Sequence, residues 1–218
     1  MKNNFRAVLF DFDGVLAETM EDLYLAWEKA FLDLNVQIKK EDYFPIEGTK
    51  VIDVAKIMSD KYKLKQDPNK IVELKNGYYL KNHNFSFYSG VNEIIDSLVS
   101  RGIKIAIVSA SPREKLEKTV PEDFLKKFDA IITGEDYIFG KPNPEPYLTA
   151  MKNLELSPGE CIVIENAPLG IKSAKSAGIY CIAITTTLDK NYLKEADKVI
   201  ESHYELSKLL NNQNSQLE

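Results

Sequence analysis

The sequence predicts an α/β fold in which helices cover both faces of a parallel sheet and an all-helical segment is inserted near the N-terminus. From about residue 89 onward, short apolar runs alternate with helical patterns, which is the arrangement expected of a parallel sheet. Between residues 17 and 88 the apolar residues recur at helical spacing, and no β-rich run interrupts them. The chain has 218 residues, enough for one large domain or two modest ones.

Each helix and strand is predicted from the spacing of its apolar residues. Strands are predicted at residues 7–10, 105–108, 130–132, 161–164, 180–184 and 198–200. Helices are predicted at residues 18–34, 51–62, 71–81 and 92–100, with a further helix that begins near Ala167 and ends at Gly178. We therefore expect a discontinuous domain of residues 1–16 and 89–218, and a helical domain of residues 17–88.

Composition and charge exclude several classes of protein. The formal net charge is -5 and the pI about 5.3, which argues against a nucleic-acid-binding protein that relies on phosphate attraction. No apolar run approaches the roughly 18 residues that cross a bilayer. The N-terminus leads almost directly into a short strand, so we expect no cleaved signal peptide and a cytoplasmic protein. Cys161 and Cys181 lie in apolar strands and are expected to be reduced core thiols.

Two carboxylates follow the first predicted strand. Asp11 and Asp13 lie in the run Phe-Asp-Phe-Asp-Gly-Val-Leu, and one residue between them places both side chains on the same side of an extended backbone. Gly14 lets the chain turn away sharply. Carboxylates at the end of a buried strand are costly unless a metal, a cation or a chemical task accounts for them. The pair therefore suits a nucleophile and a proton-transfer group that act on one substrate.

Polar residues also follow two later strands and occupy one proline-rich loop. Ser109 follows the strand at 105–108, and the pair Glu165-Asn166 follows the strand at 161–164. Lys141 lies in the loop Gly-Lys-Pro-Asn-Pro, which its prolines stiffen. Because ligands of such sheets bind at the carboxyl ends of the strands, these side chains are expected to meet. After Ser109, a helix is expected to start with Ser111 as its N-cap and Glu114 closing a capping box.

In this order, the four motifs resemble those of the haloacid dehalogenase superfamily of phosphotransferases, and most closely the subgroup of beta-phosphoglucomutase and small sugar phosphate phosphatases. The resemblance implies a Rossmann-like core with an inserted helical cap. It also implies that Asp11 attacks phosphorus to form an aspartyl-phosphate, while Asp13 acts as general acid and base. Ser109, Ala110 and Lys141 would bind the phosphoryl group.

The same resemblance implies Mg²⁺ as the cofactor. Its ligands would be the Asp11 side chain, the Asp13 backbone carbonyl and a residue of the pair Glu165-Asn166. The family usually has an aspartate where this chain has Asn166, so weaker metal binding is expected, and Glu165 could compensate directly or through water.

Substrate choice is expected to lie in the helical cap, which would open and close over the site. Candidate contacts are Glu18, Thr19, Gly48, Thr49, Lys50, Lys75 and Asn76. Where beta-phosphoglucomutases carry a cap histidine and an arginine, this chain has Leu23 and Val51 or a neighbour. We therefore expect a phosphatase that acts on a small phosphorylated metabolite such as a sugar or polyol phosphate, with a phosphomutase as the alternative.

Three other classes of protein share parts of this pattern. A phosphate-binding protein of the same fold with weak catalysis is a second alternative, motivated by Asn166. A receiver-type signalling module would need no helical insertion, and a dinucleotide oxidoreductase would carry a glycine-rich loop after the first strand. The partner is expected to be a small metabolite, with no nucleic acid or membrane, and the protein is expected to be a monomer.

Overall fold

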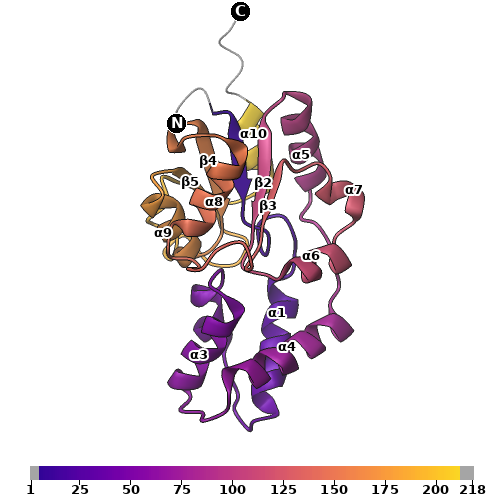
Figure 1. Ribbon diagram of the computed structural model, residues 1–218, viewed down its shortest axis with the longest axis vertical. Coiled ribbons are helices and arrows are strands. Elements are labelled where there is room, and N and C mark those ends of the chain that lie inside the picture. Colours follow the sequence, from indigo (N-terminus) through magenta and orange to yellow (C-terminus); the bar gives the residue numbers. More distant parts are fainter. Residues whose placement is uncertain (1–4, 212–218) are drawn as a thin grey trace, which may run out of the picture.

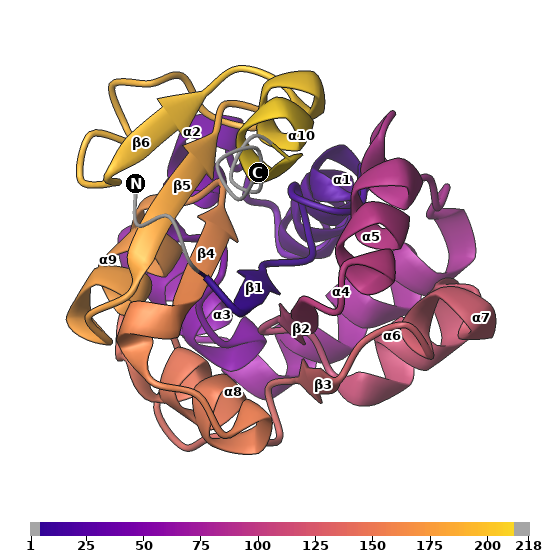
Figure 2. The same ribbon diagram turned by 90° about the horizontal axis from the view of Figure 1, so that it is seen from above.

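The computed structural model describes residues 5–211 and has a six-stranded sheet at its centre. Every strand pairs in parallel with its neighbours, in the order β3-β2-β1-β4-β5-β6. The strands are β1 (Ala7–Phe10), β2 (Lys104–Val108), β3 (Ala130–Ile132), β4 (Cys161–Glu165), β5 (Tyr180–Ile184) and β6 (Lys198–Ile200). The prediction of an α/β fold with a parallel sheet is confirmed (Figure 2).

Helices cover both faces of the sheet because successive strand residues point to opposite sides. Val8 and Phe10 pack with α5 (Val91–Ser100), α6 (Arg113–Thr119) and α10 (His203–Asn211). Ala7 and Leu9 pack on the other face with α8 (Glu145–Leu154) and α9 (Pro168–Ser176). Two short elements remain outside the helical segment: α7 (Glu122–Leu125), whose Phe124 packs in the first cluster, and η2 (Pro158–Glu160).

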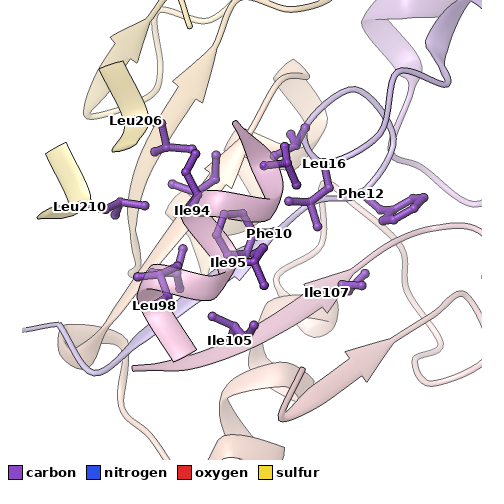
Figure 3. Close-up of a cluster of buried hydrophobic side chains, with 14 of the residues drawn as sticks. Phe10, Phe12, Leu16, Ile94, Ile95, Leu98, Ile105, Ile107, Leu206 and Leu210 are labelled. Carbon is purple, nitrogen blue, oxygen red and sulfur yellow. The ribbon is translucent and has the colours of Figure 1, made fainter. Parts of the chain in front are cut away.

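The first of these two cores fixes the position of β1. Figure 3 shows the α5 side chains Ile94, Ile95 and Leu98 directed at Phe10 and at β2. Burying each aliphatic or aromatic side chain of this size stabilises the fold by roughly 1.5–3 kcal/mol. Together with the second core on the opposite face, this packing fixes β1 and therefore the position of Asp11, the residue that follows the strand.

A helical segment, residues 20–82, connects β1 to α5. It contains α1 (Met20–Leu32), α2 (Lys40–Tyr43), η1 (Phe44–Ile46), α3 (Val51–Lys61) and α4 (Pro68–Asn82). These helices bury an apolar cluster of their own, with Trp27 and Phe31 of α1 among its members. In Figure 1 they lie below the sheet, apart from the helices that cover its faces. The chain leaves and re-enters the core side by side, where Ala17 pairs with Phe87.

The strand order places β1 at the point where the connections reverse direction. From β1 the chain moves outward through β2 to β3, and it then returns to β4 on the other side of β1. Such a reversal leaves a crevice at the carboxyl ends of the central strands, where ligands of open α/β sheets bind. Asp11, Ser109 and Glu165 all lie at these ends, on the side that faces the helical segment.

Two further expectations concern the described residues. Cys161 and Cys181 are both buried and free, as predicted. Within residues 5–211, no helix combines the length and the apolar character needed to span a membrane.

Candidate active site

Asp11 follows β1 directly and lies buried at the centre of the site. Its backbone N–H donates to the carbonyl of Ile164, which continues the pairing of β1 with β4 past the end of the strand. One carboxylate oxygen, Oδ1, accepts a hydrogen bond of 2.7 Å from Lys141 Nζ. Burial raises the pKa of Asp11 well above its usual range; the cationic Lys141 opposes this shift and the Glu165 carboxylate adds to it.

Lys141 is fully buried and bridges two carboxylates. Its Nζ lies 2.7 Å from Asp11 Oδ1 and 2.7 Å from Glu165 Oε1, and 3.2 Å from the carbonyl of Val108. Burial lowers the pKa of this lysine, but Asp11 and Glu165 outweigh it, so the net pKa is raised and the side chain is a fixed cation. When both carboxylates are ionised, they carry one negative charge more than Lys141 balances.

Glu165 ends β4, and both of its carboxylate oxygens accept hydrogen bonds. Oε1 accepts from Lys141 and from the Tyr147 hydroxyl at 2.8 Å, while Oε2 accepts from the backbone N–H groups of Asn166 and Ala167. Gly170 makes room for this carboxylate, because a Cβ there would lie 1.8 Å from Oε1. These contacts hold Lys141 beside Asp11, and the expectation that Glu165 assists metal binding directly or through water stays a prediction.

Asn166 presents an unused oxygen to the site. Its Nδ2 donates to the Thr187 hydroxyl at 2.8 Å, which fixes the direction of the amide. Its Oδ1 is buried and has no hydrogen-bond partner among residues 5–211. A buried acceptor without a partner is costly, so this atom is suited to a ligand that the chain itself does not supply. Gly14, with φ +84°, lies so close that a Cβ would be 2.1 Å from Asn166 Nδ2.

The donor set fits a small divalent cation. Within the described part of the chain, no three His, Cys, Asp or Glu side chains are grouped as a metal site, so a bound ion would also need amide or backbone oxygens. Asp11 and Asn166 Oδ1, which has no partner among the described residues, are the kind of oxygen ligands that Mg²⁺ prefers. The excess negative charge of Asp11 and Glu165 over Lys141 further favours a cation here.

Asp13 is held by three side-chain donors. Its Oδ1 accepts from the Thr19 hydroxyl at 2.6 Å, and its Oδ2 accepts from the Ser111 hydroxyl at 3.0 Å. Lys115 Nζ contacts both oxygens, at 3.0 and 3.2 Å. Burial alone would raise the pKa of Asp13, but Lys115 and the hydrogen bonds outweigh it and the net pKa is lowered. The pKa values of the two aspartates are thus shifted in opposite directions by their surroundings.

The segment after β2 differs in one respect from the prediction. Ser109 is buried, and its Oγ accepts from the Ser111 N–H at 3.1 Å, while the carbonyl of Ala110 lies against Gly134. Ser111 was expected to be the N-cap of the next helix, but α6 begins at Arg113 without a side-chain cap. The prediction was wrong because the Ser111 hydroxyl is directed to Asp13, and Glu114 instead pairs with Lys118 on the surface.

The helical segment brings some of the predicted substrate contacts to the site but not all. A Cβ on Gly48 would lie 3.4 Å from Lys141 Cδ, so this loop lies against the buried lysine. Thr49 is buried beside it. Lys50 donates to the Tyr137 carbonyl at 2.7 Å, and its ammonium lies over the Tyr137 ring, so it ties the loop to the core.

Lys75 is the buried cation of the helical segment. Its Nζ lies 5.6 and 5.4 Å from the ring centroids of Trp27 and Tyr79. Among residues 5–211 it has no carboxylate within 4.0 Å, and it makes one long contact, 3.5 Å, with Oδ1 of the half-buried Asn76. Burial, together with the nearby Lys115, lowers the pKa of Lys75 to about 8. Glu18 is exposed, and the Thr19 hydroxyl donates a hydrogen bond to Asp13.

The sequence did not predict four side-chain contacts that support the site residues. They are made by Lys115, Ser111, Tyr147 and Thr187, which support Asp13, Glu165 and Asn166. Lys115 lies on α6, the helix expected after Ser109, and Tyr147 lies on α8. On either helix, the local sequence does not indicate which distant residue a lysine or a tyrosine contacts. The only available signal was their distance of a few residues from the Ser109 and Lys141 motifs.

Comparison with known proteins agrees with this geometry. The family model described as haloacid dehalogenase-like hydrolase matches residues 8–184. Protein SUPPRESSOR OF QUENCHING 1 of Arabidopsis thaliana is 31% identical over 87% of this chain, although the chain spans only 19% of that protein's length. A phosphorylated carbohydrates phosphatase of Thermotoga maritima is 30% identical, over 79% of this chain and 82% of its own length.

Among solved structures, a beta-phosphoglucomutase from Clostridium difficile superposes with a TM-score of 0.83 at 25% identity, covering 96% of both chains. The sheet order, the paired aspartates after β1 and the family match over residues 8–184 therefore agree, and this chain belongs to the haloacid dehalogenase-like hydrolase family.

Proposed function

We propose that this protein is a Mg²⁺-dependent phosphatase that hydrolyses a small phosphorylated metabolite, such as a sugar or polyol phosphate, through an aspartyl-phosphate on Asp11. The observation that carries the proposal is the buried Asp11 carboxylate, which has Lys141 on one oxygen, together with the Asn166 amide oxygen, which follows the neighbouring strand β4 and has no partner among residues 5–211. When bound, Mg²⁺ would supply positive charge that keeps Asp11 ionised and offsets the charge of the phosphoryl group.

Each residue then has a defined task. Asp11 forms a bond to phosphorus as the bond from phosphorus to the ester oxygen breaks, and that oxygen takes a proton from Asp13. In the second step, Asp13 accepts a proton from the water that attacks phosphorus, and the Asp11 carboxylate and inorganic phosphate are released. Lys141 and the Ser109 hydroxyl stabilise the phosphoryl oxygens, where catalysis depends mainly on positioning and charge.

The helical segment supports the assignment to a small substrate. The Gly48–Lys50 loop is tied to Tyr137 of the core and lies against Lys141, so the helical segment approaches the buried carboxylates closely. The buried Lys75 lies close enough to Asp13 and Lys115 for their charges to shift its pKa, and it has no carboxylate within 4.0 Å in the described residues, so a polar or anionic group of the substrate would complete its contacts. We propose residues 17–88 as a cap domain that admits substrate and excludes water.

A phosphomutase is the alternative, favoured by the similarity to the Clostridium difficile beta-phosphoglucomutase. Against it, Leu23 is buried in the apolar cluster of the helical segment, so this position offers no proton-transfer group to a sugar hydroxyl. The related phosphatase of Thermotoga maritima acts on phosphorylated carbohydrates, which supports hydrolysis of a sugar phosphate here.

The test is phosphate release from a panel of monoesters with and without Mg²⁺, with Asp11→Asn as the control. The panel includes both glucose 1-phosphate anomers, glucose 6-phosphate, phosphoglycolate, glycerol phosphates and nucleoside monophosphates. We expect metal-dependent release that Asp11→Asn abolishes. Conversion of beta-glucose 1-phosphate to glucose 6-phosphate without net release would establish the mutase instead. No release from any ester at any Mg²⁺ concentration would favour a phosphate-binding protein.

A further inference from the structure

A buried lysine of α6 contacts the proposed acid-base residue. Lys115 Nζ lies 3.0 and 3.2 Å from the two Asp13 oxygens and 2.9 Å from the Ser111 hydroxyl. Both partners of the ion pair are at least nine-tenths buried. Within the described residues, Lys115 is the only cation in contact with Asp13, and it is the only donor that reaches both carboxylate oxygens.

The position of α6 explains how the lysine reaches the site. The helix begins at Arg113, shortly after Ser109 and Ser111, so its first turn lies beside the carboxyl ends of β1 and β2. Lys115 and Leu116 are the buried residues of this helix, whereas Lys118 pairs with Glu114 in solvent. The Lys115 ammonium also lies 4.7 Å from the ring centroid of Tyr79 on α4, so it is enclosed between the core and the helical segment.

Enclosing a charged side chain in this way is costly unless the ion pair has a use or a strong partner. The other charged groups near Asp13 are Asp11, Glu47 and Lys75, and none of the three makes a hydrogen bond or an ion pair with its carboxylate in the described structure. The neutral donors Thr19 and Ser111 each bind one oxygen, whereas Lys115 contacts both oxygens and the Ser111 hydroxyl, so it adds the charged contact that holds the whole group together.

Proton transfer in a phosphatase depends on the placement of the acid-base group, since a displacement of about 1 Å can cost on the order of 100-fold in rate. We propose that Lys115 is a positioning residue of the reaction: its ammonium group holds the Asp13 carboxylate where Asp13 can exchange a proton with the leaving group and with the attacking water. The inference rests on the proposed phosphatase function, and it adds a residue to which the family motifs assign no task.

The test compares two esters of similar size whose leaving groups differ in their need for a proton. The leaving group of p-nitrophenyl phosphate is stable as an anion, whereas the alcohol of benzyl phosphate leaves poorly unless it is protonated. We expect Lys115→Met to lower kcat/KM for benzyl phosphate by about 10- to 100-fold, because general acid catalysis contributes roughly 100- to 10,000-fold. For p-nitrophenyl phosphate, kcat/KM should change by less than about threefold.

The second step gives an independent readout with the same variant. Because Asp13 also activates water, Lys115→Met should release a burst of p-nitrophenolate and then turn over at least about tenfold more slowly than wild type. Lys115→Arg, which keeps the cation, should restore part of the benzyl phosphate activity. Lys118→Met is the matched control, since it removes an exposed lysine from the same helix, and it should leave both substrates unchanged.

The outcomes separate the two hypotheses. Equal losses of kcat/KM for both esters, or no loss for either, would overturn the role of Lys115 while leaving the phosphatase intact. If wild type hydrolyses neither ester faster than Asp11→Asn does, the proposed function itself fails. Should Lys115→Met not fold, Ser111→Ala removes a neutral donor from the same carboxylate; it should show the same selective loss for benzyl phosphate, and an equal loss for both esters would contradict the inference.

Discussion

Replacing Lys141 with methionine tests the electrostatics of the site directly. The substitution keeps most of the apolar stem of the lysine but removes its ammonium group. Lys141 Nζ lies 2.7 Å from Asp11 Oδ1 and 2.7 Å from Glu165 Oε1, and within the described residues it is the only cation between these carboxylates. Breaking a buried ion pair by removing one partner typically costs about 3–5 kcal/mol. We expect a loss of this size in the free energy of unfolding at pH 8 without metal.

The pH dependence follows from the sign of the pKa shift. Burial raises the pKa of Asp11 in the folded state, so its contribution to stability is present at low pH and is lost as the pH rises through that raised value. Without Lys141 the pKa rises further, and retaining a proton on one carboxylate costs about 1.4 kcal/mol for each pH unit above its ordinary pKa of about 4. The loss caused by Lys141→Met should therefore shrink to about 1 kcal/mol at pH 5.

Urea unfolding of the wild-type protein and of Lys141→Met at pH 5 and pH 8, in the presence of a chelator, measures the difference in the free energy of unfolding at each pH. Lys172→Met provides a control for a lysine in a solvent-exposed pair and should cost less than about 1 kcal/mol at either pH. A loss for Lys141→Met that is the same at both pH values, or that stays below about 1 kcal/mol at pH 8, would refute the reasoning.

Three further predictions concern the metal and the helical segment. Asn166→Asp adds a charge to the proposed ligand set and should tighten Mg²⁺ binding by about tenfold in calorimetry; unchanged affinity would contradict the ligand role. Gly14→Ala would place a Cβ 2.1 Å from Asn166 Nδ2 at a φ of +84° and should weaken Mg²⁺ binding and activity, whereas Gly77→Ala, with open space around it, should do neither. Lys50→Met removes the contact with the Tyr137 carbonyl and should raise KM a few-fold with little change in kcat, as measured by steady-state kinetics; a selective fall in kcat would argue against it.

Much of the fold could be predicted because local periodicity determines it. The strand predicted at 180–184 matches β5, and the helix predicted at 51–62 matches α3 to within one residue. In the site, Asp11 and Lys141 lie 130 positions apart in the sequence but are joined by a 2.7 Å hydrogen bond, as the order of strand ends led us to expect.

The contacts that could not be predicted depend on side chains that compete for partners far apart in the sequence. Ser111 has the pattern of an N-cap, but the buried Asp13 carboxylate has the greater need of its hydroxyl. Lys115 and Lys118 look alike on a short amphipathic helix, and only the packing of α6 shows that one is buried against Asp13 and the other exposed. Lys50 likewise donates a hydrogen bond to the Tyr137 carbonyl, 87 positions away, because its loop packs against the core.

The most direct test of the central claim is whether a phosphoryl group is transferred to Asp11 during turnover. The enzyme, with Mg²⁺ and the best ester of the panel, is quenched in acid within the first turnover, and its peptides are analysed by mass spectrometry. We expect one phosphoryl group on the peptide that contains Asp11, with borohydride reduction of the acyl phosphate marking that residue, and none in Asp11→Asn. Rapid turnover with the label on another residue, or with no covalent phosphate at any time, would contradict the proposed mechanism.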